Sequence, residues 1–270
     1  MRNRKRIELI FVIILLMSPF LTGGIVSVNP ATDEEEIIFI PAAKERNMGR
    51  QINEKVLKTF KLPVDPLMQE RIRGIGEKLS SGADRNDIVY RFTVLKGEKK
   101  DTYNAFAAPG GYVYIFSDLV EVLDTDDEIA GVLAHEMAHV EAKHSIKRLQ
   151  GSLGVTALML LGSQLKTEDN SAVYLGSAVN QLMAEYSRQD ERQADELSVK
   201  YMERTGYDPM GAIGALEKLR GLRKEGKRMK YFFNKSHPYL SERIAGLEKD
   251  INGQMNFNSY INLVQDKDAM

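Results

Sequence analysis

The stretch that decides the fold is His135-Glu136-Met137-Ala138-His139, an H-E-x-x-H sequence. In a helix with about 100° per residue, His135 and His139 lie roughly 40° apart, on one face. Two imidazoles one turn apart can both bind one cation. Glu136 points away from that direction but stays close enough to take a proton from a water that the cation holds. A zinc hydrolase needs these two ligands and this base.

The residues around this stretch predict that it is helical. Thr125 and Glu128 have the spacing of a capping box, so the helix is expected to begin there. Apolar residues then recur at helical spacing, at Ile129, Val132, Leu133, Met137 and Val140. A solvated helix can carry the five-residue pattern by chance, so a zinc site also requires a third ligand elsewhere in the chain.

Composition limits the chemistry that is available. The chain has 270 residues, of which 43% are hydrophobic and 28% charged, and this is typical of a globular protein. Its net charge of −1 gives no indication of a nucleic-acid partner. Cysteine is absent, which excludes disulfides, thiolate ligands and a cysteine nucleophile. Imidazole chemistry must use the four histidines, which are His135, His139, His144 and His237.

Residues 1–24 are predicted to be a targeting segment. Basic residues within positions 2–6 precede an apolar run from Leu9 to Leu21, and Thr22-Gly23-Gly24 offers small residues for cleavage. The run is shorter than the about 20 residues of a membrane-spanning helix, which favours a secretory signal over an uncleaved N-terminal anchor. Both alternatives place the body of the protein in the periplasm or otherwise outside the cytoplasm. Membrane association, peripheral or through the N-terminal segment, remains an alternative, and residues 25–42 are expected to be a linker.

Helices are predicted on both sides of the H-E-x-x-H stretch. Helical periodicity indicates them at residues 43–61, 65–80, 172–183, 187–205, 209–224 and 241–251. A short apolar run at 155–161 is expected to pack into the core, and residues 253–270 are expected to be a peripheral C-terminal tail.

Strands are predicted just before the H-E-x-x-H stretch. Residues 88–96 show partial alternation, and residues 104–116 predict a strand, a Pro-Gly-Gly turn and a second strand. By sequence alone, a plain hairpin is the preferred interpretation of 104–116. The functional alternative is an edge strand that pairs with an extended peptide substrate. Under this alternative the substrate-binding residues are Asn104, Gly110, Gly111, Tyr112 and Val113.

Residues 187–195 offer carboxylates for the third ligand. Glu191 and Asp195 lie four residues apart, hence on one face of the predicted helix. Glu191 can complete a two-His, one-Glu zinc site that leaves the fourth position for water. Asp195 can accept the spare N–H of a ligand histidine and fix its tautomer. Asp190 and Glu196 are also candidates, and an acid-rich surface helix is the structural alternative.

Four sequence elements together resemble one protein family. They are Asn104-Ala105-Phe106 with Pro109-Gly110-Gly111, His135-Glu136 with His139, Val140 and His144, Glu191 with Ala194-Asp195, and Ser236-His237-Pro238 with Arg243. In this order they resemble the HtpX-type, CAAX-prenyl-protease-like zinc metallopeptidases of the gluzincin group, whose relatives include BepA and the Oma-type proteases. The resemblance covers about residues 45–250.

The resemblance implies a role for each residue. The roles are zinc ligand for His135, His139 and Glu191, general base for Glu136, stabilisation of the oxyanion for His237, support of a ligand histidine for Asp195, and support of the oxyanion side for Arg243. His144 lies about 140° round a continuous helix from His139, so we expect it to be structural.

The fold and the function follow from the same resemblance. The implied fold is α+β and mostly helical, a zincin-like domain over residues 43–252 with a small sheet beside the metal-binding helices. The implied function is that of a zinc endopeptidase which binds one Zn²⁺ and cleaves misfolded or unassembled cell-envelope proteins. The alternative is a non-catalytic, chaperone-like envelope protein in which His237 is a fourth ligand that closes the zinc site.

Overall fold

The computed structural model describes residues 25–38, 40–63, 65–97, 101–152, 185–224 and 236–268. Its elements are β1 (Ile25–Val28), β2 (Glu35–Ile38), α2 (Ala42–Thr59), α3 (Pro66–Ser80), β3 (Arg91–Leu95), β4 (Ala105–Ala108), β5 (Tyr112–Phe116), α4 (Ser117–Val122), α5 (Asp126–Glu141), α6 (His144–Ser152), α9 (Arg188–Thr205), α10 (Met210–Lys224), α12 (Leu240–Asn252) and α13 (Phe257–Asp268). The predicted targeting segment, the apolar run 155–161 and the helix 172–183 lie outside the described residues. Within the described ranges, no helix is both long and apolar enough to cross a membrane.

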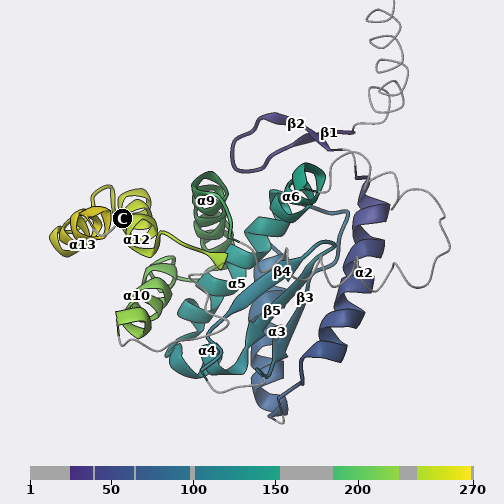
Figure 1. Ribbon diagram of the computed structural model, residues 1–270, viewed down its shortest axis with the longest axis horizontal. Helices are drawn as coiled ribbons and strands as arrows, with labels where there is room; N and C mark the ends of the chain where they lie inside the picture. Colours follow the sequence, from purple (N-terminus) through teal and green to yellow (C-terminus); the bar gives the residue numbers. More distant parts are fainter. Residues whose placement is uncertain are drawn as a thin grey trace, which may run out of the picture.

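Helices dominate the described chain, and they surround a small sheet, which confirms the predicted α+β class (Figure 1). This sheet has the strand order β3-β5-β4, with β3 parallel and β4 antiparallel to β5. β4 and β5 are the arms of the hairpin predicted at 104–116. Its turn contains Gly110 and Gly111 with φ angles of +77° and +91°, where a residue with a Cβ would be strained.

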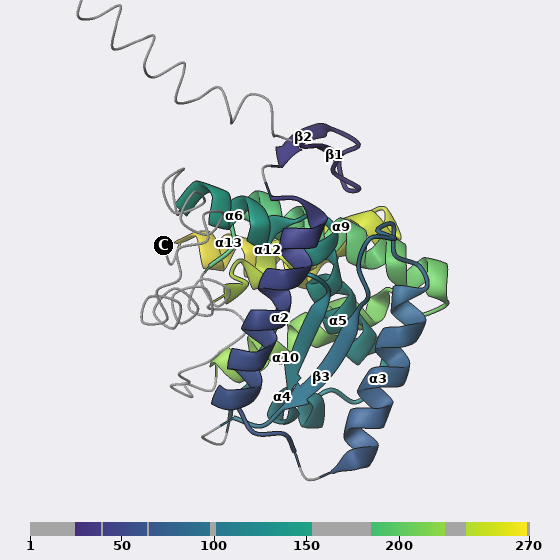
Figure 2. The same ribbon diagram turned by 90° about the vertical axis from the view of Figure 1, so that its right-hand side faces the viewer.

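Side chains of this sheet alternate between two hydrophobic clusters, as expected for a strand period of two residues. Tyr114 of β5 packs in one cluster with Ile52 of α2. Its neighbours Val113 and Ile115 pack on the opposite face, in the large cluster that includes α3, α5 and α9. Figure 2 shows α2 and α3 on opposite sides of the sheet. The sheet is therefore covered on both faces.

The H-E-x-x-H stretch lies on α5, which begins where the sequence predicts. The Thr125 hydroxyl accepts a hydrogen bond from the Glu128 N–H at 3.1 Å, and the Glu128 carboxylate accepts one from the Thr125 N–H at 3.3 Å. Every residue of α5 from Ile129 to Glu141 is buried. Helices α9 and α10 pack against α5. The helix thus carries its histidines through the interior of the molecule.

The prediction of a linker over residues 25–42 is wrong for most of that range. Residues 25–38 form the β1–β2 hairpin, in which Ile25 lies opposite Ile38. The four consecutive acidic residues at 33–36 are typical of a solvated segment and favoured the linker prediction. Its last member, Glu36, instead pairs with Lys147 of α6 at 2.6 Å, which attaches the hairpin to the domain.

The predicted C-terminal tail contains a further helix, α13. Glu248 of α12 accepts hydrogen bonds from the Asn256 N–H at 3.0 Å and from the Ser259 hydroxyl at 2.9 Å. These bonds attach the start of α13 to α12. The outward side of α13 is exposed at Phe257 and Tyr260, so this helix lies at the surface.

Candidate metal centre

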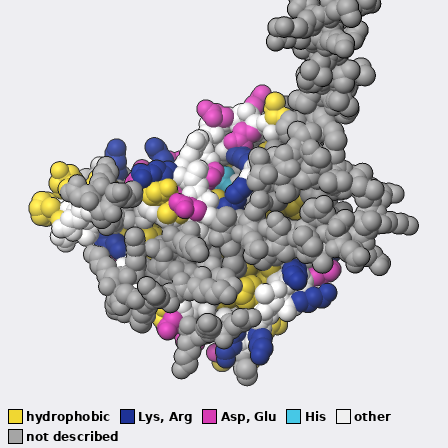
Figure 3. Space-filling view, in the orientation of Figure 1, with side chains coloured by type: hydrophobic (Ala, Val, Ile, Leu, Met, Phe, Trp, Pro, Cys, Tyr) yellow, Lys and Arg dark blue, Asp and Glu magenta, His cyan; other side chains and the backbone are white. Residues whose placement is uncertain are grey.

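His135 and His139 converge as their spacing predicts. They lie one turn apart on α5, and their Nε2 atoms are 3.1 Å from each other. Their exposed fractions are 3% and 0%. On the face drawn in Figure 3, described histidine surface shows only as a small patch. The two rings therefore meet in the interior and not on a solvated face.

The third donor comes from α9, which packs against α5. Glu191 is buried, and its carboxylate oxygens lie 3.5 Å from the Nε2 atoms of both histidines. Helix α9 starts at the capping residue Ser187, whose hydroxyl and N–H both bond to Asp190. Asp190 is therefore engaged at the helix start, and Glu196 pairs with Arg192 at 2.8 Å. Of the four carboxylates that the sequence left open, the structure brings Glu191 to the Nε2 atoms of His135 and His139, whereas Asp195 lies at the Nδ1 of His135.

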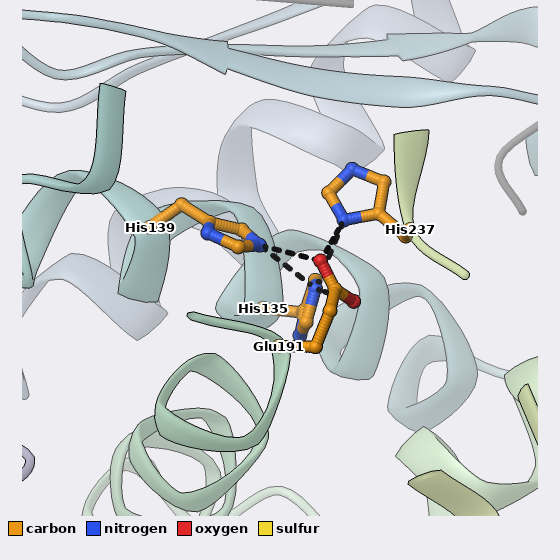
Figure 4. A group of neighbouring side chains, drawn as sticks. All are labelled: His135, His139, Glu191 and His237. Atoms are coloured by element: carbon orange, nitrogen blue, oxygen red, sulfur yellow. Dashed lines mark hydrogen bonds and ion pairs between the residues drawn. The ribbon is translucent and has the colours of Figure 1, made fainter. Parts of the chain in front are cut away.

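His237 joins these three side chains. It lies just before α12, it is fully buried, and its Nδ1 is 3.0 Å from Glu191 Oε1 and 3.3 Å from His135 Nε2. One atom from each of His135, His139, Glu191 and His237 lies within 4.8 Å of the other three, as Figure 4 shows. The sequence prediction put His237 beside the metal, and the structure places it among the donor atoms themselves.

These donor atoms fit one zinc ion. Tetrahedral ligands at about 2.1 Å from zinc lie roughly 3.4 Å from each other. Five contacts among the four side chains measure 3.0 to 3.5 Å, and all four donor atoms lie within 4.8 Å of one another. The Nδ1 atoms of His135 and His139 have other partners, Asp195 at 2.9 Å and His144 at 2.8 Å. With both Nδ1 atoms engaged elsewhere, both Nε2 atoms are turned to the same point 3.1 Å apart, where one cation can bind them both.

Arg243 balances the carboxylates of the centre. Its guanidinium donates to both oxygens of Asp195, at 2.7 and 2.9 Å, and lies 2.8 Å from Glu191 Oε2. Burial alone would raise the pKa of each carboxyl, but Arg243 holds both pKa values below the ordinary range, with help from His237 on Glu191 and from His135 on Asp195. Both carboxylates are consequently ionised. Asp195 lies 2.9 Å from His135 Nδ1, and these contacts of Arg243 are to the carboxylates and not to the oxyanion side that the resemblance implied.

The pKa of His135 depends on the same network. Burial, the largest effect, and the charge of Arg243 both oppose protonation of the ring. Hydrogen bonds to Asp195 and Glu191 outweigh them and raise its pKa to about 8 in the absence of metal. A cation at Nε2 replaces that proton, so metal binding releases it.

Glu136 lies beside the donors but does not belong to them. Its side chain is fully buried, and its Oε1 is 3.2 Å from His237 Nε2. Burial, partly opposed by His237 and His135, raises the pKa of Glu136 above the ordinary value for a glutamate. A carboxylate whose pKa is raised in this way is suited to accept a proton from a water and to release it again.

His144 touches the metal centre, and the sequence analysis missed this contact. The prediction assumed a continuous helix, but α5 ends at Glu141, and Lys143 adopts a left-handed conformation with φ of +55°. The chain turns there, and His144 Nδ1 reaches His139 Nδ1 at 2.8 Å. His144 is thus buried against the outer nitrogen of His139, on the side away from the donor atoms.

Tyr186 is a second residue that the sequence gave no signal for. Its ring stacks on the imidazole of His139 with centroids 3.8 Å apart and an interplanar angle of 18°. Its backbone N–H donates to the Ser236 carbonyl at 3.0 Å, next to His237. Tyr186 therefore packs against one donor and is attached to the segment that carries another.

The predicted substrate strand needs a correction. Tyr112 and Val113 lie on β5, whose two edges are occupied by β3 and β4, so this strand cannot pair with a peptide. Gly110 and Gly111 belong to the turn, and the Gly110 N–H donates to Glu45 at 3.1 Å. The Asn104 carbonyl accepts from Phe116 within the hairpin at 2.9 Å. Within the described residues, β4 pairs on one side only, and it packs against α5.

Comparison with known proteins agrees with this geometry. The model of Peptidase family M48 matches residues 66–251. The chain is 28% identical over 187 residues to the Beta-barrel assembly-enhancing protease of Escherichia coli (strain K12), an alignment that covers 65% of this chain and 37% of that protein. It is 27% identical over 241 residues to the Mitochondrial metalloendopeptidase OMA1 of Saccharomyces cerevisiae, an alignment that covers 82% of this chain and 67% of that protein. It is 33% identical over 147 residues to the Metalloprotease YcaL of Escherichia coli, an alignment that covers 52% of this chain and 55% of that protein.

The chain thus spans little more than a third of the length of the β-barrel assembly-enhancing proteases that it matches. The family model contains all of α5, α9 and α12 up to Ile251. The described residues that make up the metal centre therefore lie inside the matched range.

Proposed function

This chain belongs to peptidase family M48, and we propose that it is a zinc-dependent endopeptidase with His135, His139 and Glu191 as zinc ligands and Glu136 as the general base. The observation that carries the proposal is the convergence of two Nε2 atoms at 3.1 Å with a buried carboxylate. Glu136 beside them supplies a proton acceptor at the place where a hydrolase needs one.

Each residue of the centre has a defined task in this proposal. When bound, zinc supplies Lewis-acid polarisation of a water and of the scissile carbonyl. Glu136 takes the proton from the attacking water and passes it to the leaving amine. Asp195 accepts the Nδ1 proton of His135, which directs Nε2 to the donor set. Arg243 keeps Asp195 and Glu191 ionised.

His237 has to change its position during turnover. Its Nδ1 lies with the donors in this structure and closes the fourth position. A catalytic site keeps that position open, so we infer that His237 withdraws from Glu191 when substrate enters. In the withdrawn position its N–H donates to the oxyanion. The non-catalytic alternative is not favoured, because Glu136 is retained beside the donors and the matched relatives are named as proteases.

The substrate is proposed to pair with β4 as an added strand. β4 is an edge strand within the described sheet and packs against the metal-bearing helix. Main-chain hydrogen bonds to such an edge depend little on the side chains of the peptide. This mode of binding suits a protease that acts on extended segments of unfolded proteins.

Misfolded or unassembled proteins of the cell envelope are the proposed substrates. A relative is named for enhancing β-barrel assembly, and the basic and apolar character of residues 1–24 supports export from the cytoplasm. We therefore place the enzyme in the periplasm or an equivalent compartment. Retention of residues 1–24 would attach it to the membrane there.

The test compares wild type with Glu136→Gln on a fluorescently labelled unfolded substrate such as casein. We expect the variant to bind as much zinc as wild type and to lose cleavage by about 10²- to 10⁴-fold, the usual contribution of a general base. Glu121→Gln, an exposed residue of α4, is the matched control and should cleave normally. Cleavage by Glu136→Gln at the wild-type rate would show that this base assignment is wrong.

A further inference from the structure

The outer nitrogen of His139 begins a series of buried hydrogen bonds that ends in the β1–β2 hairpin. His139 Nδ1 lies 2.8 Å from His144 Nδ1, and His144 Nε2 lies 3.0 Å from Gln193 Oε1. The Asn29 amide donates to the same Gln193 oxygen at 3.3 Å. All four side chains are at most 7% exposed. The series therefore connects a proposed zinc ligand to a segment more than 100 residues away in the sequence.

Which atom donates in each hydrogen bond of this series follows from Gln193, whose side-chain oxygen can only accept. Gln193 Oε1 can only accept, and it already accepts from the Asn29 amide, so His144 Nε2 must carry a hydrogen and donate to it. An imidazole that carries its hydrogen on Nε2 has a lone pair on Nδ1, so His144 Nδ1 can accept a hydrogen bond. His139 Nδ1–H then donates to that atom, and the lone pair of His139 is left on Nε2, the atom in the donor set.

Three further contacts hold the hairpin where Asn29 can make its bond. The Lys143 ammonium donates to the Ser27 hydroxyl at 2.9 Å. Lys147 pairs with Glu36 at 2.6 Å. Asn29 is itself fixed in the turn, because its amide also donates to Glu36 at 2.9 Å. Lys143 and Lys147 lie on either side of His144 in the sequence, so both contacts attach the hairpin to the segment that carries this histidine.

We propose that His144 is a positioning residue for His139, and that the β1–β2 hairpin contributes to zinc affinity through Asn29 and Gln193. This inference rests on the proposed zinc site and goes beyond it, since it assigns a role to a part of the chain outside the matched family range. His139 Nδ1 has the same kind of partner in His144 that His135 Nδ1 has in Asp195. Outer partners of metal-bound histidines typically contribute 10- to 100-fold to metal affinity.

The experiment measures the zinc dissociation constant of the full chain by competition with a chromophoric chelator. His144→Asn places its amide near the position of Nδ1 and keeps an acceptor for His139. His144→Gln places its amide near the position of Nε2, and so keeps the contact to Gln193 but not the one to His139. We expect zinc affinity about 2- to 10-fold weaker than wild type for the Asn variant, which loses the contact to Gln193, and about 10- to 100-fold weaker for the Gln variant, which loses the contact to His139.

A second pair of variants tests the hairpin. Asn29→Ala removes the donor to Gln193 and should weaken zinc binding by about 2- to 10-fold, the effect of one hydrogen bond. Thr32→Ala, an exposed residue of the same turn, is the control and should bind zinc as wild type does. Thermal unfolding of each metal-free variant is recorded in parallel, because a merely structural role would move melting temperatures and leave the zinc affinities equal.

The outcomes separate this inference from the proposed function. Equal zinc affinities for His144→Asn and His144→Gln would overturn the positioning role of His144, with the zinc site intact. Wild-type zinc affinity in Asn29→Ala would overturn the contribution of the hairpin alone. A wild-type chain that binds no zinc would overturn both the inference and the proposed zinc enzyme.

Discussion

Replacement of Arg243 by methionine gives the largest effect on stability that we expect from the metal centre. The guanidinium makes contacts of 2.7 to 2.9 Å with Asp195 and Glu191, and its side chain is only 5% exposed. Methionine fills a similar volume but leaves the buried carboxylates of Asp195 and Glu191 without their guanidinium partner. Removal of one partner from a buried ion pair costs about 3–5 kcal/mol.

The assay is thermal unfolding of the metal-free protein, followed by circular dichroism with a chelator present. In a chain of this size a loss of 1 kcal/mol lowers Tm by about 2–4 °C. Arg243→Met should therefore lower Tm by about 6–20 °C. The chelator is needed because a bound cation would itself offset the charge of Glu191 and mask part of the loss.

Arg71→Met is the matched control. Arg71 pairs with Asp126 at 2.6 Å, but the two side chains are 42% and 58% exposed. Solvent screens such a pair, so its loss should cost at most about 1 kcal/mol. If Arg243→Met unfolds within 4 °C of wild type, or no earlier than Arg71→Met, the claim that Arg243 balances the buried carboxylates is refuted.

Two further predictions concern packing and pH. Gly131→Ala should lower the free energy of unfolding by roughly 1–3 kcal/mol, because the added Cβ would lie 2.6 Å from the Ala212 Cα. The control is Gly74→Ala at an exposed position with nothing within 4 Å of the added Cβ, and it should raise the free energy of unfolding by up to about 1 kcal/mol. Urea unfolding measures both variants, and equal effects would contradict the close contact at Gly131. Burial would raise the pKa of Asp84, but hydrogen bonds from Arg204, Lys200 and Tyr201 lower it below 3.8, the ordinary value for an aspartate. The stability that the Asp84 carboxylate contributes is therefore complete above the pKa of the unfolded chain, and it is lost as the pH falls through the lower pKa of the folded protein. The cost of Asp84→Asn should accordingly be constant above about pH 5 and shrink as the pH falls below about 4, and a cost that does not change with pH would count against this pairing.

Local signals predicted the helices of the metal centre well. The Thr125–Glu128 capping box predicted the start of α5, and Asp65, the first residue of the predicted helix 65–80, is the residue that caps α3. Such signals involve residues within one or two turns of each other. The sequence therefore contains them without any knowledge of the fold.

Strand order is a long-range property and was not available from the sequence. The hairpin at 104–116 was predicted, but β3 pairs with β5 and not with β4, and this makes β5 the central strand. Because β3 comes before β4 in the chain, nothing local shows which arm of the hairpin it joins. Among the described strands, the hairpin arm with an unpaired edge is consequently β4 and not β5.

The break after α5 and the docking of the hairpin also lack local signals. Lys143 has a left-handed backbone, which glycine or asparagine usually marks. Asn29 and Glu36 lie in a polar, acidic segment that resembles solvated linker, and their partners lie 111 or more residues away. The contact of His144 with His139 depends on both features, so sequence spacing alone could not reveal it.

Zinc content of the purified chain, measured by elemental mass spectrometry for wild type beside Glu191→Ala, tests the central claim most directly. Exposed Glu203→Ala on the same helix serves as the control. We predict about one zinc per chain in wild type and in the control, and little in Glu191→Ala, because that change removes the anionic donor and leaves the Arg243 cation, now without this partner, beside the site. Zinc retained in full by Glu191→Ala would contradict the assignment of this ligand, and a wild type without zinc would contradict the account of the site as a zinc peptidase centre.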